Sequence, residues 1–302
     1  MAGCAIRRVG AVMYATTSRG VYAVHSNFMV LPQKILDIRR RGLRSAAHKL
    51  GFFGIASDWS NKVYVAERVR CSWIKKRQNT LVTCICIEDF SVESQVKVAD
   101  CSDVHQVALQ KNRLFLTDTG KNRVLVFDLE KRCLQQTINL GIERRDKNHI
   151  NAIKVVDDQL LIGLNNRSES DSAIIEIPID RIFSEKVIID GFSLGFYRRI
   201  NGKSDTHDLE PVGNKILCSA SKQGHVFDLK TADVIFSGSG WVRGITSDQD
   251  YIYVGSSPNA SRKERHTAEL SPKITKISKD DFSVVNEQVL HSAGQLNDLL
   301  YE

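Results

Sequence analysis

The chain has 302 residues, of which 42% are hydrophobic and 25% are charged, a composition typical of a globular protein with one large or two small domains. Its formal net charge of +7 comes from short, dispersed basic runs without interleaved aromatic residues, which argues against a nucleic-acid-binding surface. No stretch is apolar for long enough to span a membrane, and the N-terminus lacks the hydrophobic segment of a signal peptide. The seven cysteines form no CxxC pair, so we expect reduced, packing cysteines in a cytoplasmic protein without membrane association.

Three strand-like segments open the chain, at residues 11–17, 20–26 and 28–33. They are rich in Val, Ala, Tyr and Thr and are separated by short turns, which is typical of β-strands. No segment before them could serve as the first strand of a four-stranded unit. The basic stretch 37–51 that follows is expected to be a partly helical crossing.

Units of four short strands then repeat along the chain. The clearest unit has strands predicted at 105–110, 113–118, 123–129 and 134–140, each bounded by Asn, Gly, Lys or Asp. A single sheet of this size leaves both faces partly uncovered, so it must be one unit of a repeat. Five complete units are predicted, at 52–100, 103–141, 149–191, 205–238 and 241–292, with the fourth strand of the 149–191 unit at 186–191. Their spacing of about 36 to 57 residues lies in the range of propeller blades.

The two ends of the chain supply a sixth unit. Residues 295–300 resemble a first strand with nothing after it, whereas the N-terminal segments resemble second, third and fourth strands. Joining 295–302 with 4–37 completes a blade and removes the open sheet edges of a linear array. We therefore predict an all-β, six-bladed β-propeller, one domain over 1–302, in which the C-terminal strand completes the N-terminal blade.

Two predicted first strands carry a resemblance to known propellers. The segments FGIASD (53–58) and VRGITSD (242–248) look like the x-x-G-I-A-x-D inner strand of NHL and SMP-30/gluconolactonase-like six-bladed propellers. The resemblance implies the fold, and it implies hydrolysis of a lactone or ester as a reaction class. In SMP-30-like propellers, Asn, Asp and Glu side chains in the channel hold calcium, and Asn151, Asp208 and Asn297 resemble that set. The glutamate of that family has no counterpart here, because Gly54 occupies the matching position.

Polar residues gather where the predicted first strands begin, beside the central channel. We align these strands on Gly54, Gln106, Asn151, Asp208, Gly244 and Asn297. His105, His207 and Arg243 then share the preceding position. Buried groups of this kind must be hydrogen-bonded, hydrated or bound to a ligand, so the channel mouth is the predicted functional site.

Long loops between second and third strands occur in alternate blades, at 68–81, 165–172 and 257–273. Their polar and basic content predicts a pocket for a small anionic or polyhydroxylated ligand, because guanidinium groups match carboxylate and phosphate. Arg243 would be the deepest cation. The other predicted substrate-binding residues are Asn165, Ser256, Arg262 and Arg265.

The pair His207-Asp208 is the strongest candidate for chemistry. His207 or His105 could act as a general base, and Asp208 as an acid or a ligand. His105, His149 and His207 could instead hold a transition metal, whereas Asn151, Asp208 and Asn297 would suit Ca²⁺. The structural alternative is that Asp208 bonds backbone amides between blades while His207 packs in the core.

The function that follows is an enzyme of the hydrolase, lactonase or lyase type acting at the channel mouth, with a divalent metal, Ca²⁺ or a transition metal, as the expected cofactor. The chain has no GxSxG, P-loop, GxGxxG or HExxH motif, which argues against the usual serine hydrolases, nucleotide-binding enzymes and zincins. The alternative is a non-catalytic propeller that binds an acidic protein or peptide partner. A closed pocket with converging His, Asp and Arg side chains would favour the enzyme, and an open flat face would favour the platform.

Overall fold

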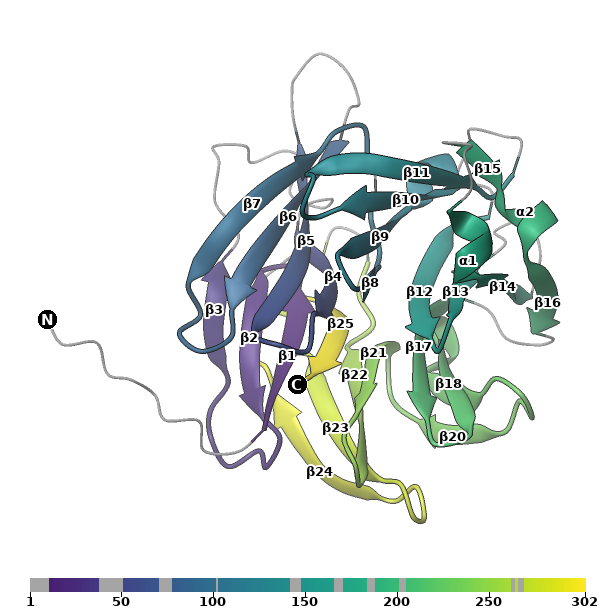
Figure 1. Cartoon of the computed structure of the whole chain (residues 1–302). Coiled ribbons are helices and arrows are strands. Elements are labelled where there is room, and N and C mark those ends of the chain that lie inside the picture. The colour runs from purple at the N-terminus through teal and green to yellow at the C-terminus, as the bar shows by residue number, and fades with distance from the viewer. Residues whose placement is uncertain are drawn as a thin grey trace, which may run out of the picture.

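The computed structural model describes residues 11–37, 51–70, 78–101, 103–141, 148–165, 171–183, 188–200, 205–261, 264–265 and 269–302. Within them the chain forms six sheets, each built on four antiparallel strands, arranged as blades in a ring (Figure 1); a fifth, parallel strand is added to one of the sheets. The all-β, six-bladed propeller predicted from the sequence is confirmed. The predicted crossing at 37–51 lies outside the described residues except at its two ends. No helix within the described part has the length and apolar character needed to cross a membrane.

Each blade runs outward from an inner strand at the channel. Blade 1 contains β25 (Leu296–Tyr301), β1 (Val12–Thr17), β2 (Gly20–His25) and β3 (Gln33–Asp37). Blade 2 contains β4 (Gly51–Ser57), β5 (Lys62–Arg70), β6 (Gln78–Cys86) and β7 (Val92–Val98). Blade 3 contains β8 (Val107–Gln110), β9 (Arg113–Asp118), β10 (Arg123–Asp128) and β11 (Cys133–Asn139).

The other three blades follow the same order. Blade 4 contains β12 (Ile150–Val156), β13 (Gln159–Leu164), β14 (Ser172–Pro178) and β16 (Phe196–Ile200). Blade 5 contains β17 (Thr206–Val212), β18 (Lys215–Ala220), β19 (His225–Asp228) and β20 (Val234–Ser237). Blade 6 contains β21 (Trp241–Ser247), β22 (Tyr251–Ser257), β23 (Lys273–Ser278) and β24 (Val284–Val289).

The ring closes where the two ends of the chain meet. β25 pairs with β1 in antiparallel register, with Ala15 opposite Leu299 and Tyr14 opposite Leu300, and the two strands lie side by side in Figure 1. This pairing satisfies the backbone groups of β1 that would otherwise form a free sheet edge. The predicted closure of the N-terminal blade by the C-terminal strand is therefore confirmed.

Two outer strands differ from the prediction. The segment expected as the fourth strand of blade 4 forms β15 (Ile188–Asp190), which pairs in parallel with β11 of blade 3. Ile189 packs there into the core of blades 3 and 4. The short helix α2 (Gly191–Leu194) then turns the chain back, and β16 becomes the fourth strand against β14.

In blade 1 the fourth strand begins at Gln33 rather than at Phe28. Phe28 has a φ of 56° and belongs to the turn after β2, and Met29 and Leu31 are largely exposed. The apolar run that begins at Phe28 therefore resembled a strand, but the turn occupies it and the strand starts five residues later.

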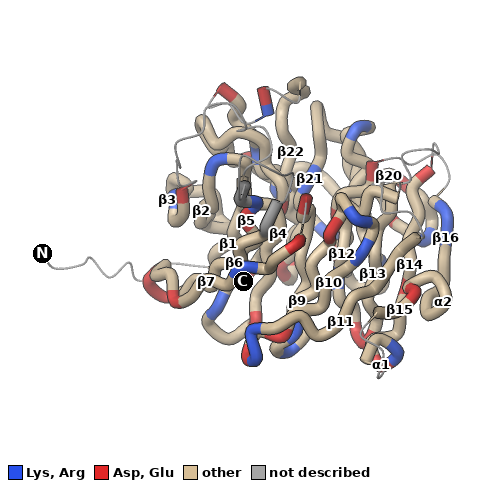
Figure 2. Tube along the Cα trace, turned by 90° about the horizontal axis from the view of Figure 1, so that it is seen from above, with Lys and Arg blue, Asp and Glu red and all other residues tan. Residues whose placement is uncertain are grey.

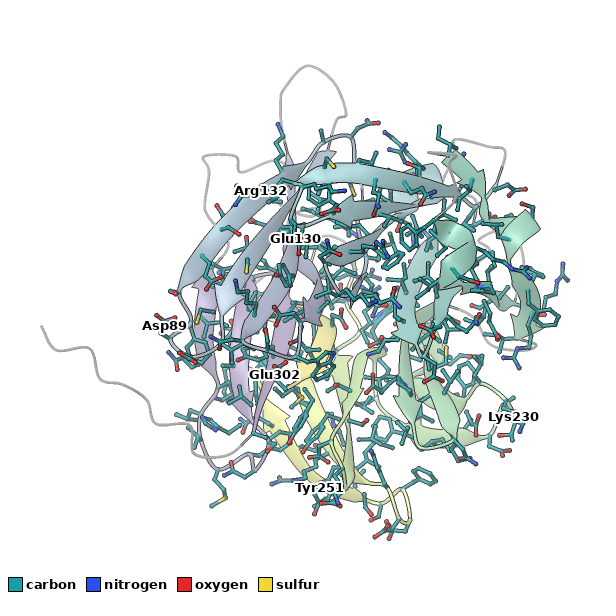
Figure 3. All side chains as sticks on the ribbon, in the orientation of Figure 1. Asp89, Glu130, Arg132, Lys230, Tyr251 and Glu302 are labelled. Atoms are coloured by element: carbon teal, nitrogen blue, oxygen red, sulfur yellow. The ribbon has the colours of Figure 1, made fainter. Side chains whose placement is uncertain are left out.

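Apolar side chains pack between neighbouring blades. One cluster joins blades 3 and 4 through Phe115, Ile138, Leu160 and Ile175, and another joins blades 1 and 6 through Met13, Tyr253 and Leu296. Figure 3 shows side chains filling the space between the sheets, whereas Asp89 and Lys230 lie at the periphery. Charged residues of both signs are interspersed around the ring (Figure 2).

Candidate functional site

The inner strands are irregular at the end where they enter the channel. The pairing register shifts between Phe52 and Ile55, between Ile150 and Ala152, and between Thr206 and Leu209. The same shift occurs in β21 and opposite β25. Such bulges re-aim side chains, and here they release one or two residues per blade from regular pairing at the channel mouth.

Hydrogen bonds between blades give the alignment of these residues. Gln106 accepts from the backbone N–H of Ile153 (3.0 Å), and Asp208 accepts from Ile245 (2.5 Å). Asp298 accepts from Ile55 (3.2 Å). Ile55, Ile153 and Ile245 therefore occupy equivalent positions on their strands, and Gln106, Asp208 and Asp298 occupy equivalent positions on theirs. The mouth position lies two residues before each isoleucine, and one residue before Gln106, Asp208 and Asp298. The mouth position is occupied in ring order by Phe53, His105, Asn151, His207, Arg243 and Asn297.

The predicted alignment was thus one residue off in two blades. Asn151 and Asn297 share the position of His105, His207 and Arg243 rather than that of Gln106 and Asp208. The position of Gln106 is taken by Ala152 in blade 4 and by Asp298 in blade 1. The sequence could not reveal this, because the bulges that set the register leave no distinct residue pattern.

Three of the predicted histidines come together at the mouth. The ring centroids of His105 and His149 are 5.1 Å apart, and those of His105 and His207 are 6.0 Å apart. Phe53 lies on the other side of His105, with the centroids 6.1 Å apart. Blades 2, 3, 4 and 5 therefore contribute rings to a single cluster over the channel.

His207 is held in one orientation and one tautomer. Its Nδ1 lies 2.7 Å from the carbonyl oxygen of Asp205. Because a carbonyl can only accept, Nδ1 carries the proton and donates, and Nε2 keeps its lone pair. Burial and then the charge of Arg243 hold the pKa of His207 well below its usual value, so the ring is neutral at neutral pH. Burial and then Arg68 lower the pKa of His105 in the same way.

Arg68 is fixed at the mouth by several contacts. Its Nε donates to the carbonyl of Val104 (2.7 Å), and its Nη1 lies 2.9 Å from a carboxylate oxygen of Asp103. Its guanidinium stacks 3.5 Å above the Phe53 ring. An arginine that makes all three contacts is rigid, and Asp103 compensates its charge.

Arg243 differs from Arg68 because no carboxylate in the described part of the chain pairs with it. It is 7% exposed, and its buried Nε has no hydrogen-bond partner among the described residues. Burial lowers the pKa of Arg243 to about 9, and the neighbouring charges of Arg265 and Arg68 add to this effect, against the opposing charge of Asp205. A buried cation beside other cations is costly unless an anion compensates it.

Arg265 and Trp241 complete this side of the mouth. The guanidinium of Arg265 lies 4.3 Å from the centre of the Trp241 ring, and that of Arg243 lies 5.6 Å from it. The indole therefore holds Arg265 near Arg243 by cation–π contact. Arg265 stands in the long loop predicted to bind substrate, and the structure brings it to the site.

The remaining predicted substrate-binding residues have other surroundings. Asn165 is engaged with Asp205, donating to its carboxylate (2.6 Å) and accepting from its backbone N–H (2.9 Å), so it links blades 4 and 5. Ser256 is buried and lines a separate cavity of about 410 Å³ with Asn259 and Lys273. Arg262 lies outside the described residues.

Acidic residues occupy the next layer of the channel. Nε2 of Gln106 donates to Oδ1 of Asp208 (2.7 Å) and lies 3.3 Å from Oδ1 of Asp298. Burial raises the pKa of Asp208 to about 6, and burial together with the charge of Asp208 raises the pKa of Asp298 well above its usual value. Sequence reasoning missed Asp298 because the predicted alignment put Asn297 at the position that Asp298 occupies.

The calcium set implied by the resemblance is not supported by this geometry. Both oxygens of Asp208 already accept from N–H donors of Gln106, Leu209 and Ile245, and Nδ2 of Asn297 donates to the carbonyl of Phe52 (2.8 Å). Among the described residues no group of three or more His, Cys, Asp or Glu side chains is arranged to hold a metal ion. A metal at His105, His149 and His207 therefore stays a prediction that the described arrangement does not support.

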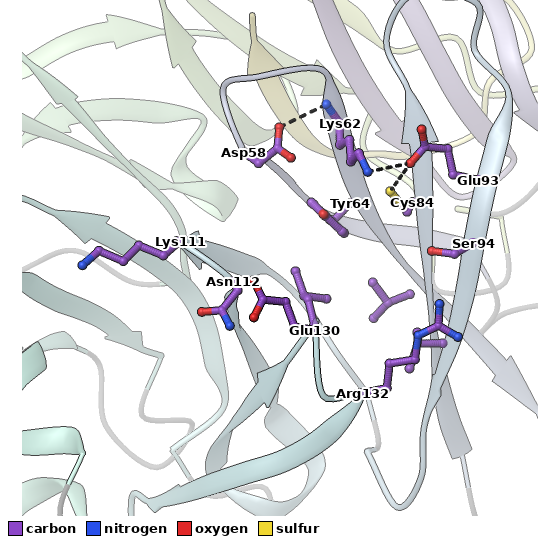
Figure 4. A pocket seen from close by; sticks show the side chains of 13 residues that line it. Asp58, Lys62, Tyr64, Cys84, Glu93, Ser94, Lys111, Asn112, Glu130 and Arg132 are labelled. Atoms are coloured by element: carbon purple, nitrogen blue, oxygen red, sulfur yellow. Dashed lines mark hydrogen bonds and ion pairs between the residues drawn. The ribbon is translucent and has the colours of Figure 1, made fainter.

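A second cavity lies on the opposite face, between blades 2 and 3 (Figure 4). Its volume is about 700 Å³, and Lys62 lies 3.0 Å from Glu93 in its wall. Burial and then the charge of Glu93 raise the pKa of Cys84 to about 11, so this thiol is a poor nucleophile. Because Lys62 pairs with Glu93 and the thiol is unreactive, we place the candidate site at the channel mouth.

No protein-family model matches the chain, and no curated protein matches it. Similar solved structures include a chain of a nidogen/laminin complex, with a TM-score of 0.65, 13% identity, and coverage of 96% of this chain and 97% of that one. A protein of unknown function from Bacteroides caccae has a TM-score of 0.61 and 10% identity, over 97% and 98% of the two chains. Identities this low establish the propeller fold alone.

Proposed function

We propose that this propeller binds a small anionic ligand, through a carboxylate or phosphate group, at the mouth of its channel. The observation that carries the proposal is Arg243, a buried cation whose Nε has no hydrogen-bond partner among the described residues. An anion in the mouth would supply the missing charge and the missing acceptor at once.

The surroundings of Arg243 support the same ligand. Arg265 is held nearby on the Trp241 ring, and both Arg265 and Arg68 act on the pKa of Arg243. Because Asp103 neutralises Arg68, Arg243 and Arg265 would account for most of the attraction. The neutral rings of His105 and His207 add hydrogen-bonding groups without adding charge.

Calorimetric titration with inorganic phosphate, acetate and succinate tests this function. The wild-type protein should bind at least one of these anions, and Arg243→Gln should weaken that binding at least tenfold, since charge-assisted bonds from arginine contribute about 1.5–3 kcal/mol. Arg198→Gln is the matched control, because Arg198 lies on the outer strand β16 and pairs with Glu176 of β14. Equal binding by Arg243→Gln and the wild type would refute the proposal.

Acid–base catalysis on the bound anion is a second candidate, favoured by the fixed tautomer of His207. The Asp205 carbonyl holds the neutral imidazole with Nε2 unprotonated. An unprotonated nitrogen with a free lone pair is the form that a general base requires. A lactonase, another hydrolase or a lyase could use such a base. Once a substrate is known, His207→Gln should lower kcat at least 100-fold with little change in KM, and an unchanged kcat would exclude the role.

The platform that binds an acidic protein or peptide stays a prediction. The buried position of Arg243 favours a small ligand over a protein surface, because small-molecule sites are concave and enclose most of their ligand.

A further inference from the structure

Asn151 is the second residue of the mouth whose polar atoms lack partners. It is fully buried, and neither its Nδ2 nor its Oδ1 has a hydrogen-bond partner among the described residues. Leaving a buried polar group unpaired costs about 1–3 kcal/mol per group. Two such atoms on one side chain are one donor and one acceptor that a bound group could pair at the same time.

The register places Asn151 in the ligand site. It is the bulged residue of β12, between the pairs Ile150–Leu164 and Ala152–Gly163. Its equivalents in the neighbouring blades 3 and 5 are His105 and His207, whose rings approach to 6.0 Å. Blade 4 stands between those blades, so Asn151 occupies the position between the two histidines.

The side chains of the next layer do not compete for Asn151. Its neighbour Ala152 offers no polar side chain, and the amide oxygen of Gln106 accepts from the N–H of Ile153. Asn297 occupies the equivalent position in blade 1 and is engaged with the Phe52 carbonyl. Asn151 thus differs from Asn297 in having its whole amide available.

We propose that the anion bound at the mouth also carries an amide-like edge, and that Asn151 recognises this edge. The inference rests on the proposed anion site. A carboxamide, ureido or lactam group presents one N–H and one C=O side by side, and the side-chain amide of asparagine matches this pair with its own acceptor and donor. The ligand class is therefore a small carboxylate or phosphate that bears an amide, ureido or lactam group.

Ligand pairs of equal charge and shape test this assignment by calorimetry. Succinamate and levulinate both carry one carboxylate, and they differ in that a methyl group replaces the amide NH₂. Malonamate with acetoacetate, and glutaramate with 5-oxohexanoate, extend the comparison to other lengths. The amidated member of the best-binding pair should bind about 10- to 100-fold more tightly, because its ketone partner leaves Oδ1 of Asn151 unpaired.

Variants of Asn151 decide whether this residue makes the distinction. Asn151→Leu keeps the volume and removes both polar atoms, so the amide preference should fall below threefold while the affinity for the ketone stays within a few-fold. Asn151→Ala should give the same loss if the leucine variant misfolds. Asn286→Leu, on the exposed outer strand β24, is the control and should keep the full preference.

The outcomes separate this inference from the proposed function. If no amidated or keto acid binds and phosphate, acetate and succinate fail as well, the anion site itself is refuted. If both members of every pair bind equally, or if Asn151→Leu keeps the amide preference, the anion site stands and the role of Asn151 is refuted. In that case Asn151 holds water only.

Discussion

Nε2 of Gln106 lies 2.7 Å from Oδ1 of Asp208, a residue 102 positions later in the chain and two blades further around the ring. Through its amide oxygen Oε1, Gln106 also accepts from the backbone N–H of Ile153, in the blade between them. One side chain therefore connects three consecutive blades across the channel.

Gln106→Ala should lower the free energy of unfolding by about 2–4 kcal/mol. The substitution leaves the N–H of Ile153 without its acceptor and removes a donor from Asp208, and buried unsatisfied groups cost about 1–3 kcal/mol each. Urea unfolding followed by fluorescence measures the change. Gln95→Ala removes a part-buried amide bonded to Thr83 in blade 2 and should cost less than about 1 kcal/mol; a similar loss for both variants would contradict the bridging role.

Gly244→Ala should destabilise the protein by about 2–4 kcal/mol. Gly244 has a φ of 76°, and a Cβ there would lie 2.9 Å from the backbone nitrogen of Leu299, so both backbone strain and a clash with β25 oppose the change. Gly213 has a φ of 58° with nothing within 4 Å of its Cβ position. Gly213→Ala therefore carries the backbone strain alone and should cost about 1 kcal/mol, and thermal unfolding compares the two.

His105→Gln should reduce the loss of stability on acidification. The pKa of His105 is lowered on folding, so the unfolded chain binds a proton below about pH 6.5 that the folded chain does not. Stability from this group is present above pH 6.5 and is lost as pH falls, by at most about 1.4 kcal/mol per pH unit. Urea midpoints between pH 7 and 5 should therefore change less in the variant, and an unchanged slope would show that His105 is not buried in its neutral form.

Asp208→Asn should change the pH dependence in the opposite sense. The pKa of Asp208 is raised to about 6, so between about pH 4 and 6 the folded chain holds a proton that the unfolded chain has released. This contribution is present at low pH and is lost as pH rises through 6. The variant lacks it, so its stability should fall more steeply on acidification than that of the wild type.

Arg243→Met should stabilise the ligand-free protein, by an amount on the order of 1 kcal/mol, while weakening anion binding. The buried guanidinium lies beside Arg265 and Arg68, and replacing an uncompensated buried charge by an apolar side chain of similar length removes the desolvation cost. Arg198→Met on β16 breaks a partly exposed ion pair with Glu176 and should change stability by less than about 0.5 kcal/mol. A large destabilisation by Arg243→Met would indicate a structural role instead.

The blades could be predicted because their strands are local. Runs such as 113–118 and 123–128 carry β-branched and aromatic residues between turn residues, and each pairs with its neighbour in sequence. The closing pair β1–β25 joins segments that are distant in the sequence. It could still be predicted, because the N-terminal blade lacked a first strand and the C-terminal strand had no blade of its own. The 186–191 segment was misassigned because its partner β11 belongs to another blade.

The candidate site was predictable in part. His105, His207, Arg243 and Arg265 were expected at the mouth and are found there. Arg68 was expected only as part of the basic 68–81 loop, and its stacking over Phe53 was not foreseen. Asp298 was not expected, since its place at the channel depends on a bulge. Bulges and side-chain stacking are set by tertiary packing, and local sequence patterns do not encode them.

One set of hydrogen bonds joins blade 1 to blade 2, blade 3 to blade 4, and blade 5 to blade 6. In each of them the side chain of Asp298, Gln106 or Asp208 accepts from the backbone N–H of Ile55, Ile153 or Ile245. The long loops follow the same alternation, since they belong to blades 2, 4 and 6. The ring is thus three similar pairs of blades. Adding or removing a single blade would place two acceptor blades or two donor blades next to each other, so this pattern is kept only when blades are added or removed in pairs.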